Sequence, residues 1–282
     1  MLATIWGSRG SLATPGRRTV RYGGNTSCVE IRAADGALLI LDAGTGIREL
    51  GLSLGENRPD RIDLLLSHLH IDHLEGLPYF SPIWDPSVEL HIWGPSSPVK
   101  SLEERIATYL SPPLFPVHLA EVPSKLVCHD APREWELGSL RIVSQPISHP
   151  GPTLGYRIHD GRGTLAYLTD HEPALGMDLR VVGTDWISGY AVAHGADVLL
   201  HDCQYTEREY DDRVGWGHSS TEHVATFAEL ADVDRLLMFH HDPMHSDDQL
   251  EAMLARVRDL RADGDAERTD LAGEGLRIEL SS

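Results

Sequence analysis

The sequence has little cysteine, and it contains no long apolar stretch. Its three cysteines, Cys28, Cys128 and Cys203, are odd in number and form no C-x-x-C pair. This disfavours a disulfide framework and favours a reducing compartment. No apolar run reaches the roughly 18 residues that a membrane helix needs, and the first residues show no apolar signal segment. We therefore expect a cytoplasmic protein without a membrane span.

Positive charge is also scarce. The chain carries 24 basic and 43 acidic residues, which gives a formal net charge of −19, and Lys100 and Lys125 are its only lysines. Such a surface repels polyanions, so we do not expect tight non-specific nucleic-acid binding. A small phosphorylated substrate remains compatible with this charge if a bound metal ion supplies local positive charge.

The 282 residues suit one sizeable core or two small ones. Since no linker or internal repeat divides the chain, we expect a single domain over residues 1–282. Apolar runs predict buried strands, with helical patterns between them. Two packed sheets with helices outside would satisfy this order. Residues 74–80 are predicted to form the first turns of a helix. The proline-rich residues 112–123 fit either a lid near the site or a plain irregular connection.

The most informative feature among the 16 histidines is a dense group that follows a predicted buried strand. Residues 67–73 read S-H-L-H-I-D-H. Imidazoles two residues apart in an extended segment point to the same side, so His68 and His70 can bind one ion. Asp72 and His73 can reach a second ion as the chain turns. Nitrogen and carboxylate ligands suit Zn²⁺, Mn²⁺ or Fe. An incidental polar loop is the alternative, but chance gives this pattern in roughly 0.4% of such chains.

Further candidate ligands lie where later predicted strands end. His149, Asp170 and the pair His240 and His241 each follow such a strand, and rigid elements commonly present functional residues at their ends. Each also has an ordinary explanation. His149 precedes Pro150 and could be a loop residue, and Asp170 could cap a helix. Beside the first motif, a role in metal binding is favoured.

Taken together, these residues resemble the metallo-β-lactamase superfamily, over nearly the whole chain from the strand at Thr4 to His240. Within it, the sequence is most similar to the phosphodiesterase branch, which includes ribonuclease Z and the phosphodiesterase associated with carbon–phosphorus lyase. Four segments carry this similarity: GSRGS at 7–11, YGGNTS at 22–27, LDAGTG at 41–46 and GHSS at 217–220. The resemblance implies an α+β fold, the four-layer αββα sandwich, with metal ions at one edge.

The resemblance also implies a role for each candidate ligand. It implies two divalent metal ions, Zn or Mn, and assigns their ligands as His68, His70 and His149 for one ion and Asp72, His73 and His240 for the other. Asp170 would bridge both ions together with a hydroxide. His240 is preferred over His241 because it aligns with the strand end of the family.

One further histidine is implied by the phosphodiesterase branch, in which a His-Ser-Thr element supplies an additional group to the site. Here the element reads His218-Ser219-Ser220, so His218 is the candidate for protonating or stabilising the leaving oxygen, with Asp72 and Asp170 as the other catalytic residues. The alternative is an ordinary residue at a helix start. Asp42 has two open interpretations, a hydrogen bond to a ligand histidine or a turn. Asp202 ends another strand and is assigned no role.

The function that these residues predict is hydrolysis by a dinuclear metal site, most similar to that of a phosphodiesterase acting on a small phosphodiester or a nucleotide-derived substrate. No insertion resembles the tRNA-binding arm of ribonuclease Z, and the acidic charge also disfavours tRNA. Three alternatives stay open. They are a hydrolase of carboxylic esters, lactones, thioesters or β-lactams, a di-iron redox protein, and a non-catalytic metal-binding module. A homodimer would be usual for such a fold.

Overall fold

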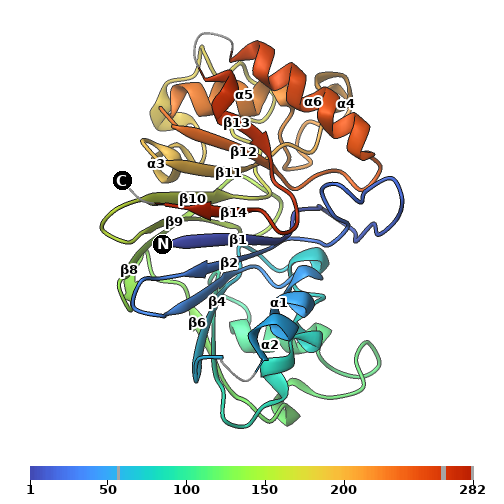
Figure 1. Cartoon of the computed structure of the whole chain (residues 1–282), viewed down its shortest axis with the longest axis vertical. Coiled ribbons are helices and arrows are strands. Elements are labelled where there is room, and N and C mark those ends of the chain that lie inside the picture. The colour runs from blue at the N-terminus through green and yellow to red at the C-terminus, as the bar shows by residue number, and fades with distance from the viewer. Residues whose placement is uncertain (56–57, 262–264, 281–282) are drawn as a thin grey trace.

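Two seven-stranded sheets form the centre of the molecule (Figure 1). The structure is a computed structural model, and it describes residues 1–55, 58–261 and 265–280. The first sheet contains, in spatial order, β14 (Arg277–Glu279), β1 (Leu2–Gly7), β2 (Cys28–Arg32), β3 (Leu38–Leu41), β4 (Arg61–Leu65), β5 (Glu89–Gly94) and β6 (Lys125–Asp130). The second contains β13 (Thr269–Leu271), β12 (Arg235–Phe239), β11 (Val198–Asp202), β10 (Thr164–Leu168), β9 (Leu154–His159), β8 (Leu140–Pro146) and β7 (Glu134–Leu137).

Each sheet has a parallel half and an antiparallel half. β3 to β6 are parallel in the first sheet, and β10 to β13 are parallel in the second. The remaining neighbours pair antiparallel, including the hairpin of β2 and β3 and that of β9 and β10. The sequences of β10, β11 and β12 are nearly continuous apolar runs because both of their faces are buried.

Three apolar clusters fill the spaces between four layers. One lies between the two sheets and contains residues from both of them, such as Leu41 and Tyr167. A second packs the first sheet against α1 (Gly46–Leu54) and α2 (Leu102–Tyr109). The third packs the second sheet against α3 (Tyr190–Ala193), α5 (Thr221–Leu230) and α6 (Asp247–Leu260). The predicted αββα sandwich is therefore confirmed (Figure 1).

The prediction of a helix at residues 74–80 is wrong. This segment forms turns that include η3 (Leu77–Tyr79), a 3-10 turn, and η4 (Ser81–Trp84) follows it. Pro78 and Pro82 lack the backbone N–H that a continuing helix needs. In addition, a Cβ at Gly76 would lie 2.0 Å from the carbonyl oxygen of Gly44, so the segment is packed too closely against that loop for a regular helix with side chains on this face.

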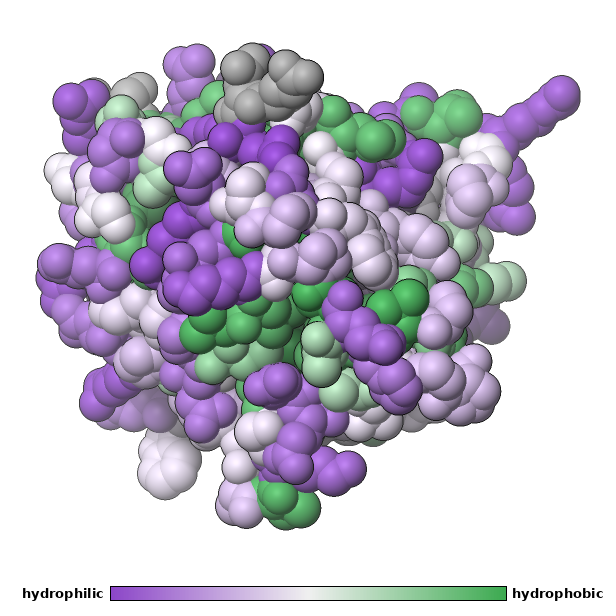
Figure 2. All heavy atoms as spheres, turned by 90° about the horizontal axis from the view of Figure 1, so that it is seen from below, coloured by the Kyte–Doolittle hydropathy of each residue, from purple (hydrophilic) through white to green (hydrophobic). Residues whose placement is uncertain are grey.

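The outer surface agrees with the acidic, charged composition. The face in Figure 2 consists largely of hydrophilic residues around a smaller apolar area. Residues 112–123 form an irregular connection from α2 to β6 that includes the 3-10 turn η5 (Leu119–Glu121). Among the described residues, no helix is both long enough and apolar enough to cross a membrane.

Candidate metal centre

The candidate site lies where the carboxyl ends of the parallel strands meet, at one edge of the two sheets. β4 leads into the segment with His68 and His70, β10 leads into Asp170, and β12 leads into His240. His149 follows β8, which runs in the same direction as β10 because each is antiparallel to β9. Parallel strands that end together explain why residues far apart in the sequence meet here.

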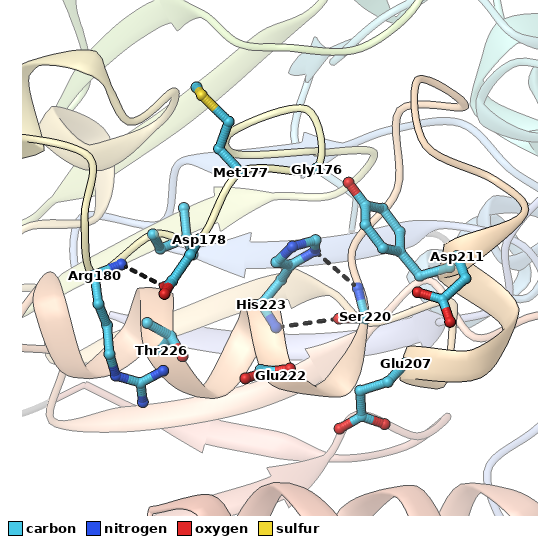
Figure 3. Close-up of a pocket in the computed structure, with 12 residues that line it drawn as sticks. Gly176, Met177, Asp178, Arg180, Glu207, Asp211, Ser220, Glu222, His223 and Thr226 are labelled. Carbon is cyan, nitrogen blue, oxygen red and sulfur yellow. Dashed lines mark hydrogen bonds between the residues drawn. The ribbon is translucent and has the colours of Figure 1, made fainter.

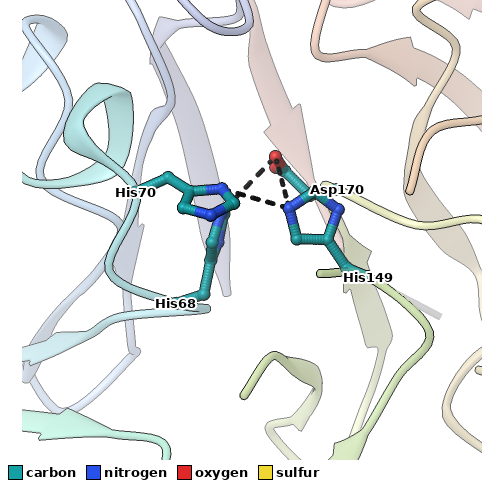
Figure 4. A group of neighbouring side chains, drawn as sticks. All are labelled: His68, His70, His149 and Asp170. Atoms are coloured by element: carbon teal, nitrogen blue, oxygen red, sulfur yellow. Dashed lines mark hydrogen bonds and ion pairs between the residues drawn. The ribbon is translucent and has the colours of Figure 1, made fainter. Parts of the chain in front are cut away.

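The first donor group consists of three histidines and one carboxylate (Figure 4). One donor atom from each of His68, His70, His149 and Asp170 lies within 4.8 Å of the others. The Nε2 atoms of His68 and His149 lie 3.6 and 3.7 Å from Asp170 Oδ1. His149 Nε2 lies 3.2 Å from His70 Nδ1. The imidazoles therefore converge on one point from two separate loops.

The second donor group is fully buried and uses the other oxygen of Asp170. It consists of Asp72 and His73 from η2 (Ile71–His73), together with Asp170 and His240. His73 Nε2 lies 3.1 Å from Oδ2 of both Asp72 and Asp170. His240 Nε2 lies 3.3 and 3.2 Å from the same two oxygens. Asp170 thus stands between the two groups, with one oxygen facing each.

The chemistry of these donors fits divalent metal ions. The Nε2 atoms of His68 and His73 are buried and have no hydrogen-bond partner in the described structure, which is costly for a polar atom unless a ligand binds it. Imidazole and carboxylate donors suit ions such as Zn²⁺ and Mn²⁺. Burial alone would raise the pKa of Asp170, but His240, His73 and His68 outweigh burial and hold this pKa well below its ordinary value. The carboxylate is therefore ionised and available as a ligand.

Asp42 fixes one of these histidines. Its Oδ2 lies 2.9 Å from His73 Nδ1 and accepts hydrogen bonds from the hydroxyls of Tyr167 and Ser67, both at 2.8 Å. Its Oδ1 accepts the backbone N–H of Ser67 at 2.7 Å. A carboxylate that accepts the Nδ1 proton of His73 orients the ring so that its Nε2 atom faces the donor group. Of the two open interpretations of Asp42, the geometry fits the hydrogen bond to a ligand histidine.

His218 lies beside the second donor group and is held by Asp202. Its Nδ1 atom lies 2.6 Å from Asp202 Oδ2, and its ring stacks on His240 with 5.1 Å between centroids. Asp202, His218 and His240 also have donor atoms within 4.8 Å of one another. Burial would lower the pKa of His218, but nearby carboxylates, Asp202 foremost, raise it to about 9. Asp202 was given no role from the sequence, although its position at the end of a strand could have indicated a site residue.

His241 is separate from the donors, unlike its neighbour. Its Nε2 donates to the carbonyl of Ala272 at 2.8 Å, whereas His240 has its Nδ1 atom 3.0 Å from Gln204 Oε1 and its Nε2 at the donor group. A backbone φ of 56° at His240 turns the chain at this point. The sequence preference for His240 over His241 agrees with this geometry, while the ligand roles themselves remain predictions.

Several residues around the donors were not identified from the sequence. The backbone N–H of Ser11 donates to Asp72 Oδ2 at 2.7 Å, and its segment GSRGS was noted only for its family resemblance. Glu172 is fully buried and accepts the backbone N–H groups of Gly215 and Gly217. Gln204 faces His240. Glutamate and glutamine are too common for sequence position alone to single these residues out.

A separate hollow of about 290 Å³ lies between residues 176–180 and α5 (Figure 3). None of the donor-group residues lines it. Its Ser220 and His223 exchange the hydrogen bonds that begin α5, and Arg180 donates its backbone N–H to Asp178. These contacts serve helix capping and a turn, and the hollow shares no residue with the candidate metal centre.

The fold and the donor groups together define a hydrolase of the metallo-β-lactamase type. The chain belongs to the β-lactamase superfamily, because the model of the "Beta-lactamase superfamily domain" matches residues 38–241, more than half of its length. The resemblance found in the sequence is thereby confirmed.

Relatives and solved structures extend this finding. Ribonuclease BN of Salmonella paratyphi C (strain RKS4594) is 25% identical over 265 residues, covering 78% of this chain and 83% of the relative. A diphosphatase from the PhnP family has a TM-score of 0.70 at 19% identity, covering 99% of this chain and 97% of that one. YhfI from Bacillus subtilis has a TM-score of 0.69 at 19% identity, covering 99% of both chains. The short form of human tRNase Z has a TM-score of 0.67 at 20% identity, covering 100% of both chains. At these identities, the structures show a shared fold.

Proposed function

We propose that this hydrolase is a dinuclear metal-dependent phosphodiesterase acting on a small phosphodiester or a nucleotide-derived substrate. The observation that carries the proposal is the position of Asp170, whose two oxygens face two different donor groups. A carboxylate between two such groups is suited to hold two ions side by side, an arrangement that serves phosphoryl chemistry. The relatives named ribonuclease BN and tRNase Z and the PhnP-family diphosphatase support the substrate class.

The donor groups suggest which residues would hold each ion, Zn²⁺ or Mn²⁺. One ion would take His68, His70, His149 and Asp170, and the other would take Asp72, His73, Asp170 and His240. When bound, such ions lower the pKa of water and withdraw charge from phosphoryl oxygens. Asp42 keeps His73 in the tautomer and orientation that this role requires.

His218 would supply the proton for the leaving oxygen. Because Asp202 accepts the Nδ1 proton, the mobile proton of the imidazole is the one on Nε2. Asp202 is itself fixed, since its Oδ1 accepts the backbone N–H groups of Gln204 and Ser219 at 3.0 and 3.1 Å. A carboxylate held in this way orients the imidazole ring and supports its protonated form, as a general acid requires.

The proposal is tested by comparing two p-nitrophenyl substrates. Protein loaded with Zn²⁺ or Mn²⁺ is assayed on bis(p-nitrophenyl) phosphate and on p-nitrophenyl acetate, beside Asp72→Ala. The matched control is Asp248→Ala, because the Asp248 side chain is 92% exposed. We expect diester cleavage that Asp72→Ala abolishes and Asp248→Ala retains. Cleavage of the acetate alone would instead support a carboxylic ester, lactone or thioester hydrolase. If the protein with two metals bound cleaves neither substrate, a hydrolytic role for the site would be contradicted.

A further inference from the structure

One buried carboxylate accepts several hydrogen bonds that hold the loop at residues 212–217. Glu172 is 0% exposed, and its two oxygens accept the backbone N–H of Gly215 at 2.9 Å and that of Gly217 at 2.8 Å. The hydroxyl of Tyr210 donates to the same group at 2.6 Å. These bonds fix the backbone on both sides of Trp216.

The same loop touches the candidate metal centre directly. The carbonyl of Gly217 accepts a hydrogen bond from His149 Nδ1 at 2.8 Å, which directs the Nε2 atom of His149 toward Asp170. Only glycine fits here, because a Cβ at Gly217 would lie 2.3 Å from His149 Nδ1 and the backbone φ is +87°. His218 is the next residue. Trp216 therefore directly precedes Gly217, whose carbonyl contacts His149, and His218 follows Gly217 in the chain.

Despite this fixed backbone, the indole of Trp216 is 60% exposed. A cation lies beside it. The guanidinium carbon of Arg213 is 6.0 Å from the Trp216 ring and 5.0 Å from the Tyr205 ring. Tyr205 in turn lies edge-on to His218 at 5.7 Å. Within residues 1–55, 58–261 and 265–280, Arg213 forms no ion pair, and its side-chain hydrogen bond goes to the neutral carbonyl of Glu209.

This combination suits one class of ligand. An exposed indole on a backbone fixed at Gly215 and Gly217 offers a flat surface on which a nucleobase can stack, and a guanidinium without a carboxylate partner offers charge to a phosphate. The chain has a net charge of −19, and this cation lies against Tyr205, whose ring contacts His218. We propose that Trp216 and Arg213 bind the base-bearing side of the substrate, so that the enzyme selects phosphodiesters of a nucleoside. This inference rests on the proposed phosphodiesterase function and names its substrate class.

The experiment compares two esters that share the p-nitrophenolate leaving group. Thymidine 5′-(p-nitrophenyl phosphate) carries a base, and methyl p-nitrophenyl phosphate carries none. The measured quantity is the ratio of their kcat/KM values with the metal-loaded enzyme. We expect the wild type to favour the thymidine ester, and Trp216→Ala to lower the ratio roughly fivefold or more, mainly through KM, as loss of one base stack predicts. Trp216→Phe should restore most of the ratio.

The matched control is Trp186→Ala, since Trp186 is 83% exposed and lies outside the donor groups and the 212–217 loop. It should leave the ratio unchanged. A wild-type ratio near one, or an equal loss on both esters in Trp216→Ala, would overturn the stacking role while leaving the phosphodiesterase intact. A change of oligomeric state in Trp216→Ala without a change in the ratio would instead assign the indole to an interface. If the metal-loaded wild type cleaves neither ester, the proposed function itself fails.

Discussion

Buried carboxylates organise most of the candidate site. Asp42 accepts from His73, Ser67 and Tyr167, and Asp202 accepts from His218 and from two backbone N–H groups. Each has several donors directed at it, so a neutral replacement of the same shape leaves donors without an acceptor. Their replacement should therefore affect the candidate metal ligand His73 and the proposed catalytic residue His218, which they orient.

Asp42→Asn tests the first of these contacts. An amide can accept through only one atom, so either His73 or Ser67 loses its acceptor. We expect Zn²⁺ affinity, measured by competition with a chromophoric chelator, to fall roughly 10- to 100-fold, as for other hydrogen bonds behind metal ligands. Asp63→Asn is the control, because Asp63 is also a buried aspartate but bonds Arg61 and Trp93. Equal affinities in the two variants would show that Asp42 does not orient a metal ligand.

His218→Ala separates proton transfer from metal binding. We expect diester turnover to fall roughly 10²- to 10⁴-fold, the usual contribution of a general acid, while the metal content per chain stays that of the wild type. The exposed His194 provides a control in His194→Ala. Loss of a metal ion from His218→Ala would contradict the assignment and would place His218 among the ligands, consistent with its nearness to Asp202 and His240.

Some strands could be predicted from the sequence more clearly than others. β4, β11 and β12 were predicted because strands buried on both faces give continuous apolar runs. β6 and β7 were not predicted, because each lies at a sheet edge and is partly exposed, with mixed sequences such as KLVCHD. β13 has only three residues. Since the site is built on the ends of the clearly patterned strands, most of its donors could still be found from sequence.

The 212–217 loop depends on its hydrogen bonds to Glu172, which could not be predicted from the sequence. Glu172→Gln should weaken it, because the amide nitrogen cannot accept the N–H groups that Glu172 now accepts. We expect faster tryptic cleavage after Arg213, detected by mass spectrometry of the released fragments. The control is Glu222→Gln on the exposed side of α5. Cleavage at the wild-type rate would show that other contacts hold the loop.

Across the whole molecule, the local motif was easier to predict than the long-range partners. His68, His70, Asp72 and His73 are found by their spacing, since one short segment carries them. Glu172 is recognised only once the fold joins distant segments, because it is one of 43 acidic residues and its sequence position does not distinguish it. A single domain over residues 1–282 and a homodimer both stay predictions.

Metal removal should destabilise the whole chain. Asp72 and Asp170 are buried near each other, and a bound cation would reduce their mutual repulsion. Ligands that bind only the native state add stability. We expect EDTA to lower the melting temperature by about 5 °C or more, if the ions are otherwise present at about 100 times their Kd. Added Zn²⁺ or Mn²⁺ should restore it in differential scanning calorimetry. An unchanged melting temperature, with metal loss verified by elemental analysis, would argue against structural coupling of the site.

The proposed sharing of Asp170 by two metal ions can be tested directly. Crystals grown with Zn²⁺ would be measured on both sides of the zinc absorption edge, so that anomalous scattering locates each ion. We expect two peaks per chain, one within the group of His68, His70 and His149 and one within the group of Asp72, His73 and His240, with Asp170 between them. A single peak, or two peaks that leave Asp170 uncoordinated, would contradict the dinuclear site.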